Sequence, residues 1–121
     1  MLLLFSCCFC SNIALAEEAR DLYFSAGFAG DEADFTWVWG VLAESNAYLG
    51  RYNEAIDAGL KYQKVFEKHL FDGYPQMRWN MIRWYLEAYR FEEAKAQFEE
   101  LHDRYKYVSG LDFSDFEYID K

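Results

Sequence analysis

The heptapeptide GRYNEAI at residues 50–56 is echoed by YRFEEAK at residues 89–95. Both copies contain an arginine, an aromatic residue, any residue, a glutamate and an alanine in that order. The two alanines, Ala55 and Ala94, are 39 positions apart (94 − 55), a separation called the repeat offset below. Repeats of this size are commonly pairs of helices that must stack on neighbouring pairs to bury their apolar faces. The repeat therefore predicts a fold built from helical hairpins.

The residues around the repeated motif follow a helical period. Hydrophobic side chains recur at every third or fourth position through residues 52–66 and again through residues 91–105, the spacing that places them on one face of a helix. The alternation typical of strands is not sustained anywhere for long. We expect an all-α fold of antiparallel helical hairpins, with helices at residues 17–28, 31–49, 51–71, 74–89 and 91–107.

Turn-forming residues fall where these helices are expected to begin and end. Gly50 follows the second helix, where a glycine commonly closes the last turn. Pro75 lies in the first turn of the fourth helix, which tolerates proline. Asp31 or Asp34 is available to cap the start of the second helix. Gly40 lies inside that helix, where glycine costs about 1 kcal/mol against alanine, so we expect another helix to approach closely there.

The repeated hairpins resemble the tetratricopeptide repeat, a helix–turn–helix unit with Trp, Leu, Gly, Tyr, Ala and Phe at signature positions. The first unit matches at Trp39, Leu42, Ala43, Gly50, Tyr52 and Ala55. The second unit matches at Tyr85, Phe91, Ala94 and Phe98. A partial earlier copy contains Glu18, Ala19, Tyr23 and Ala26.

The resemblance covers roughly residues 35–107 and departs from the family in identifiable ways. The repeat offset exceeds the family's usual length of about 34 residues. Arg78 stands where the family prefers Trp, and Tyr89 where it prefers Gly. The resemblance implies two to two and a half hairpins stacked as a short right-handed superhelix that binds other proteins. An unrelated helical bundle is the alternative fold.

Residues 78–85 form a basic, aromatic island in an acidic chain. In tetratricopeptide arrays the first helix of each unit lines a concave groove. Arginine and tryptophan are favoured anchors of interfaces, and arginine can hold a carboxylate through two hydrogen bonds. We therefore expect a peptide or protein partner, with acidic peptides among the candidates. The competing interpretation is that the tryptophans are core and the arginines pair with local acids. The groove residues implied by the resemblance are Gln76, Trp79, Asn80, Arg83 and Glu87, with Met81, Ile82 and Tyr85 in the core.

No pattern of residues indicates catalysis. His69 and His102 lie on different expected helices, and the sequence has no zinc-ligand spacing, phosphate-binding glycine loop or nucleophile elbow. We therefore expect neither an enzyme nor a metal or cofactor site. A net charge of −9 argues against nucleic acids and anionic membrane surfaces as partners. The alternative function is a small-ligand or substrate-binding accessory domain of the cell envelope, with the tryptophan-rich region as its pocket.

Residues 1–16 contain no acidic residue, basic residue or proline, open with an apolar run, and end in Ala14-Leu15-Ala16 immediately before Glu17. This pattern is typical of a secretory signal peptide, and the run is shorter than the about 20 residues that a membrane-spanning helix needs. We expect a secreted or periplasmic protein whose mature chain starts at Glu17 and has no cysteine, with its helical domain at residues 17–108. Because no basic residue precedes Arg20, a buried first helix, a late gene start and a lipoprotein signal at residues 4–7 are alternatives.

Residues 109–121 form an acidic tail that alternates acidic and aromatic residues. Three interpretations are open: a disordered motif for a partner, a segment that folds back on the basic island, or a chain end that continues into further repeats. A second copy of this chain is another candidate partner, since about three repeats are normally needed for a stable stack.

Overall fold

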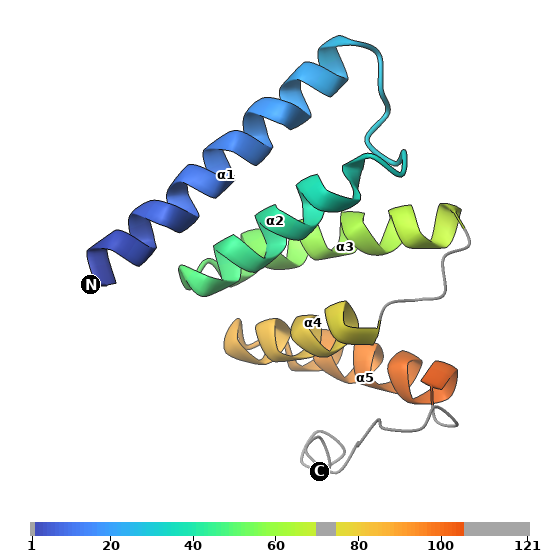
Figure 1. Cartoon of the computed structure of the whole chain (residues 1–121). Helices are drawn as coiled ribbons and strands as arrows, with labels where there is room; N and C mark the ends of the chain where they lie inside the picture. The colour runs from blue at the N-terminus through green and yellow to red at the C-terminus, as the bar shows by residue number, and fades with distance from the viewer. Residues whose placement is uncertain (1, 70–74, 106–121) are drawn as a thin grey trace. The chain divides into compact units, whose positions relative to one another are not determined.

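A computed structural model describes residues 2–69 and 75–105, with side chains placed for residues 10–69 and 76–103. The described residues form helices and no strand, which confirms the all-α class (Figure 1). The helices are α1 (Leu2–Ser25), α2 (Phe35–Tyr48), α3 (Tyr52–Lys68), α4 (Pro75–Glu87) and α5 (Phe91–Tyr105).

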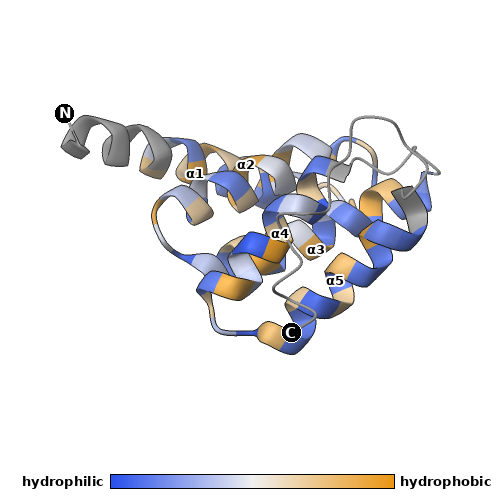
Figure 2. Cartoon of the chain, turned by 90° about the horizontal axis from the view of Figure 1, so that it is seen from below, coloured by the Kyte–Doolittle hydropathy of each residue, from blue (hydrophilic) through white to orange (hydrophobic). Residues whose placement is uncertain are grey.

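The chain divides into two compact units, residues 1–73 and 74–121. In the first unit α2 packs against both α1 and α3, and in the second α4 packs against α5. Hydrophobic and hydrophilic residues alternate along α5 as its ribbon turns (Figure 2). This is the pattern of a helix that buries one face and exposes the other.

Aromatic packing holds the first unit together at the end of α1. The Phe35 ring is fully buried, and its centroid lies 5.1 Å from that of Tyr23, 5.4 Å from Phe24 and 5.6 Å from Trp39. Further along α2, the Tyr62 ring from α3 packs over Gly40, where an added Cβ would lie 3.4 Å from the ring. Gly40 is thus in ordinary van der Waals contact with a side chain of α3, and the close helix–helix approach expected there stays a prediction.

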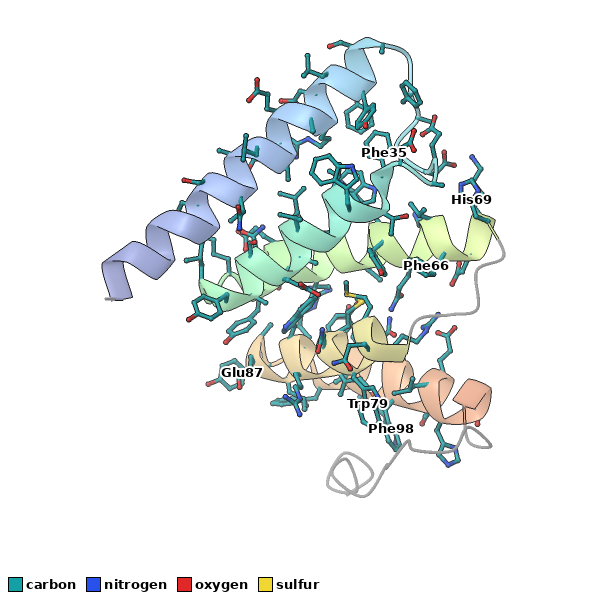
Figure 3. The ribbon with its side chains drawn as sticks, in the orientation of Figure 1. Phe35, Phe66, His69, Trp79, Glu87 and Phe98 are labelled. Atoms are coloured by element: carbon teal, nitrogen blue, oxygen red, sulfur yellow. The ribbon has the colours of Figure 1, made fainter. Side chains whose placement is uncertain are left out.

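The second unit has its own small core between α4 and α5. Ile82, Phe98 and Leu101 are buried together, and Trp79 and Leu86 pack against them. Figure 3 shows the Trp79 and Phe98 side chains lying close together between their two helices.

The two hairpins repeat each other in their backbone hydrogen bonds. At the end of α2, Gly50 has φ 80° and the Arg51 N–H donates to the Asn46 carbonyl at 2.8 Å. At the end of α4, Tyr89 has φ 60° and the Arg90 N–H donates to the Tyr85 carbonyl, also at 2.8 Å. Both are Schellman turns, in which one left-handed residue closes a helix. The repeat offset therefore relates equivalent turns of the backbone as well as similar residues of the sequence.

Two local expectations about helix starts have different outcomes. Pro75 begins α4 as expected. Asp34 does precede α2, but its side chain makes no capping hydrogen bond, and the carboxylate of Asp31 instead lies 2.9 Å from the Lys68 ammonium on α3. Asp34 is therefore the N-cap residue of α2, one of the two candidates that the sequence offered, although its side chain does not cap the helix.

The first helix begins earlier than the sequence pattern indicates. It runs without a break from Leu2 to Ser25, so the segment expected to be a signal peptide and the helix expected at residues 17–28 are one element. Ile13 and Ala16 of this segment are buried. Within residues 2–69 and 75–105, no helix combines the length and apolar character needed to cross a membrane.

Candidate functional site

The five residues predicted to line a groove all lie on α4, at spacings that place them along one side of the helix. Gln76, Arg83 and Glu87 are exposed, and Asn80 is half-buried. The Gln76 amide donates to the Asn80 side-chain oxygen at 3.1 Å. This side of α4 therefore presents amide groups at its start and charged groups towards its end.

Trp79 differs from the other four because its ring is held by the core of the second unit. It packs against Ile82, Phe98 and Leu101 and is only partly exposed. Trp84 is buried, as are the predicted core residues, whose placement is thereby confirmed: Met81, Ile82 and Tyr85. The basic island thus contains one tryptophan in the core and one at its edge.

The two arginines of the island have different surroundings. The Arg78 side chain is 5% exposed and its Nη1 lies 3.0 Å from an oxygen of Glu100, and it donates to the Gln97 side-chain oxygen at 3.2 Å. Both partners belong to α5, so Arg78 holds the α4–α5 hairpin together. Arg83 is exposed and makes no ion pair with any described residue. A partner's carboxylate can therefore reach Arg83 but not Arg78.

The five α4 residues have counterparts on α2, 39 positions earlier in the chain, that form an equivalent face of that helix. Its members are Trp37, Gly40, Val41, Glu44 and Tyr48. Trp37 is 48% exposed and Tyr48 is 60% exposed, and Glu44 carries the charge opposite to that of its counterpart Arg83. Reasoning from the basic island alone missed this aromatic face, although the repeat offset was sufficient to find it.

A hollow absent from the sequence predictions lies in the first unit, where α1 and α3 flank α2. It has a volume of about 370 Å³ and adjoins a second hollow of about 210 Å³, and Trp39 and Lys61 line both. Trp39 is 3% exposed, and its ring N–H donates to the Gly30 carbonyl at 2.8 Å. The Lys61 ammonium lies 4.7 Å from the centroid of the Trp39 ring, a cation–π contact that joins α3 to α2.

The turn at the end of the smaller hollow is held by two acidic residues. The Glu32 carboxylate accepts hydrogen bonds from the Ala29 and Gly30 backbone at 2.9 and 2.8 Å, and the Ala29 bond is the main cause of a lowered Glu32 pKa. The Asp31 carbonyl oxygen lies 3.0 Å from the His69 ring nitrogen (Figure 3). This turn is therefore tied to the last residues of α3.

The described ranges contain no group of three or more His, Cys, Asp or Glu side chains arranged to hold a metal ion. His69 is used in the turn contact, and His102 lies beside Asp103, with 3.7 Å between their side-chain atoms. Comparison with protein-family models, curated proteins and solved structures gave no match.

Proposed function

We propose that this chain is an exported, tetratricopeptide-like repeat protein that binds a peptide or protein partner. The observation that carries the proposal is the repetition of one hairpin along the chain, down to the turn closed by Gly50 and Tyr89. Ala55 and Ala94, which follow these turns, are both completely buried. A tight turn followed by a small buried residue is the feature that resembles the tetratricopeptide unit.

We further propose that the exposed side of α4 contacts the partner. Arg83 supplies a guanidinium that no described acid neutralises, which favours an acidic group on the partner. Trp79 supplies an aromatic surface whose ring is already fixed by Phe98 and Leu101. A side chain that is ordered before binding loses little conformational entropy on binding, which suits it to an interface.

Partner capture with matched charge variants tests this site. We expect Arg83→Glu to weaken binding of a partner from the native cell envelope by at least about 10-fold, since reversing a contact charge adds repulsion to the lost attraction. Lys95→Glu is the control, because Lys95 is an exposed residue of α5 and its substitution makes the same change in net charge. Circular dichroism should show unchanged helicity for both variants. Equal loss of binding in both variants, or no loss in either, would contradict the proposed site.

We propose export on the basis of the sequence of residues 14–17. Cleavage after Ala16 would cut within α1, so the test of export also shows how much of α1 the native protein keeps. Removal of residues 1–16 would shorten α1 to its last turns and take away the buried Ile13 and Ala16. Mass spectrometry of the native protein should find Glu17 at the N-terminus. An intact Met1 would instead show that α1 is retained whole.

A further inference from the structure

A second candidate site lies wholly within the first unit, in the two adjoining hollows between α1 and α3. All of the residues that line them follow residue 16, so they persist in a chain that begins at Glu17. The base of the larger hollow includes Trp39, Leu42 and Asn46 from α2. The larger hollow alone, at about 370 Å³, is within the usual range of volumes for ligand sites.

One wall of this groove is a line of charges on α3. Glu54, Asp57, Lys61 and Lys64 succeed each other at intervals of three, four and three residues, so they follow one face of the helix. The two acids lie towards the start of α3 and the two lysines towards its end. With a rise of 1.5 Å per residue, the centres of the two charge pairs are about 10 Å apart along the helix.

The contacts within the unit leave this line of charges largely unneutralised. Asp57 and Lys61 have the i, i+4 spacing that suits an ion pair, yet the Lys61 ammonium lies over the Trp39 ring. Glu54, Asp57 and Lys64 form no ion pair with any described residue.

The other charges around the groove largely cancel one another. On α1, Arg20 lies 3.1 Å from Asp21 and 4.0 Å from Glu17. At the far end, Asp31 is occupied by Lys68. Arg51, which also lines the larger hollow, offsets part of the charge of Glu54. The lysine end is therefore the more strongly charged of the two.

A buried amide adds a polar group to the base of the groove. Asn46 is 8% exposed, and its nitrogen donates to the Leu42 carbonyl at 2.7 Å. Its oxygen accepts no hydrogen bond from a described residue. That oxygen can therefore accept an N–H group from a bound chain, which suits a peptide backbone better than a purely apolar ligand.

We propose that this groove binds an extended peptide segment in which an acidic group and a basic side chain are three residues apart. The acidic group would contact Lys61 and Lys64, and the basic side chain would contact Glu54 and Asp57. In the polyproline II form of an extended peptide, three residues make one turn and span about 9 Å, so the two side chains lie on one face at close to the separation of the two charge pairs. The proposal rests on the proposed peptide-binding function, but it concerns a surface separate from the α4 face.

Blocked eight-residue peptides with a Lys-Ala-Ala-Glu centre test the charge pattern directly. Two peptides with Lys-Ala-Ala-Lys and Glu-Ala-Ala-Glu centres, and one with Lys and Glu adjacent, are the comparisons. In nuclear magnetic resonance titrations of the full chain, we expect Lys-Ala-Ala-Glu to bind at least about 10-fold more tightly than the others. The shifted amides should lie in residues 54–64 and not in α5. Equal affinities for all four peptides, or shifts confined to α4 and α5, would overturn the proposal.

A specificity switch provides the second test. Glu54→Lys/Asp57→Lys makes the whole line positive, so the preferred peptide should change to Glu-Ala-Ala-Glu. Glu99→Lys on α5 is the control and should leave the original preference in place, since Glu99 is exposed and outside the groove. If the double variant loses helicity, Lys64→Glu alone should still weaken Lys-Ala-Ala-Glu binding by about 5-fold or more.

The two proposals fail independently. An unchanged preference in a folded Glu54→Lys/Asp57→Lys variant would overturn the groove proposal. Partner capture that still depends on Arg83 would in that case leave the α4 proposal standing. If the peptide binds in the groove but partner capture does not depend on Arg83, the groove proposal stands and the α4 proposal is overturned.

Discussion

The α2–α3 and α4–α5 hairpins have the same backbone plan and are held together by different chemistry. Trp39 and Lys61 in the first hairpin occupy the positions of Arg78 and Glu100 in the second, because the repeat offset relates each pair of residues. The first pair makes a cation–π contact, and the second makes an ion pair with a separation of 3.0 Å. The repeat thus specifies where the two helices must be joined but not which interaction joins them.

The two hairpins also carry side chains of different size at equivalent positions. Around Trp39 the joining residues leave hollows that reach Lys61 on α3. Gly59 of the first hairpin corresponds to Phe98 of the second by the same offset, and Phe98 fills the core of its unit.

Removing the aromatic member of the first pair should have the largest effect on stability. Trp39→Ala deletes a buried ring, its hydrogen bond to Gly30 and its stacking on Phe35, and we expect a loss of about 3–5 kcal/mol in unfolding free energy. Trp37→Ala is the matched control, because Trp37 is 48% exposed, and it should cost about 0.5 kcal/mol or less. Urea unfolding followed by circular dichroism measures both. Similar losses for the two variants would mean that Trp39 is not the central contact.

Charge reversal at the equivalent residues Lys61 and Glu100 should also destabilise the two hairpins unequally, but by a smaller amount. Glu100→Lys places an ammonium beside the buried Arg78, and we expect a loss of about 2 kcal/mol, reduced from a fully buried pair because Glu100 is partly exposed. Lys61→Glu removes only the contact with the Trp39 face and should cost about 1 kcal/mol or less.

A double variant checks the interpretation of this pair. Arg78→Trp/Glu100→Lys recreates the Trp39–Lys61 arrangement in the second hairpin, and its unfolding free energy should exceed that of Glu100→Lys alone. Equal losses for Glu100→Lys and Lys61→Glu, or no recovery in the double variant, would argue against equivalent positions.

The features of the fold that the sequence predicts are those that depend on neighbouring residues. Helical spacing and the glycine at residue 50 are local signals, so α2 to α5 and the turn after α2 were predicted correctly, whereas α1 begins earlier than predicted. Leu60 and Phe91 also have the spacing of buried residues, yet they are 36% and 57% exposed. Spacing defines a broad stripe on a helix, and only the packing of other helices determines which part of that stripe is covered.

The candidate sites show the same limit. The α4 face could be predicted by counting positions, because Gln76, Arg83 and Glu87 belong to one helix. The groove over α2 could not, because its lining comes from three helices and a turn, and no local pattern shows how these elements pack together. Its line of charges on α3 is visible in the sequence, but the position of Lys61 over Trp39 is not, and that contact is what takes Lys61 away from the ion pair expected with Asp57.

Substitutions in the turns that close α2 and α4 should change the unfolding free energy by about 1 kcal/mol, in opposite directions. Tyr89 adopts a left-handed conformation that costs a non-glycine residue about 1–2 kcal/mol, and its side chain is 81% exposed. We expect Tyr89→Gly to stabilise the chain by about 0.5–1 kcal/mol after the added flexibility of the unfolded state is included. Gly50→Ala should destabilise by about 1 kcal/mol through conformation alone, since no atom lies within 4 Å of its added Cβ. Denaturation midpoints with unchanged slopes would measure both, and a destabilised Tyr89→Gly variant would show that the tyrosine ring stabilises the turn.

The smallest expected difference between the units concerns two glutamates with lowered pKa values, the half-buried Glu32 and the exposed Glu93. The pKa of Glu32 is lowered mainly by the backbone hydrogen bond from Ala29, and the pKa of Glu93 is lowered mainly by the hydrogen bond from the Arg90 side chain. Because the folded pKa is below the unfolded one in both cases, each contribution to stability is present above the ordinary glutamate pKa of 4.5 and is lost as the pH falls through the folded pKa.

Salt distinguishes the two causes of these pKa shifts. In carboxyl-resolved magnetic resonance titrations, we expect the Glu93 pKa to rise towards its usual value in high salt, because added ions screen an exposed charge pair. The Glu32 pKa should change less, because its main hydrogen bonds come from uncharged backbone N–H groups. Glu32→Gln and Glu93→Gln should each remove one part of the stability loss below pH 4.5. Equal salt sensitivity at the two sites would mean that the Lys68 charge, rather than the turn backbone, controls Glu32.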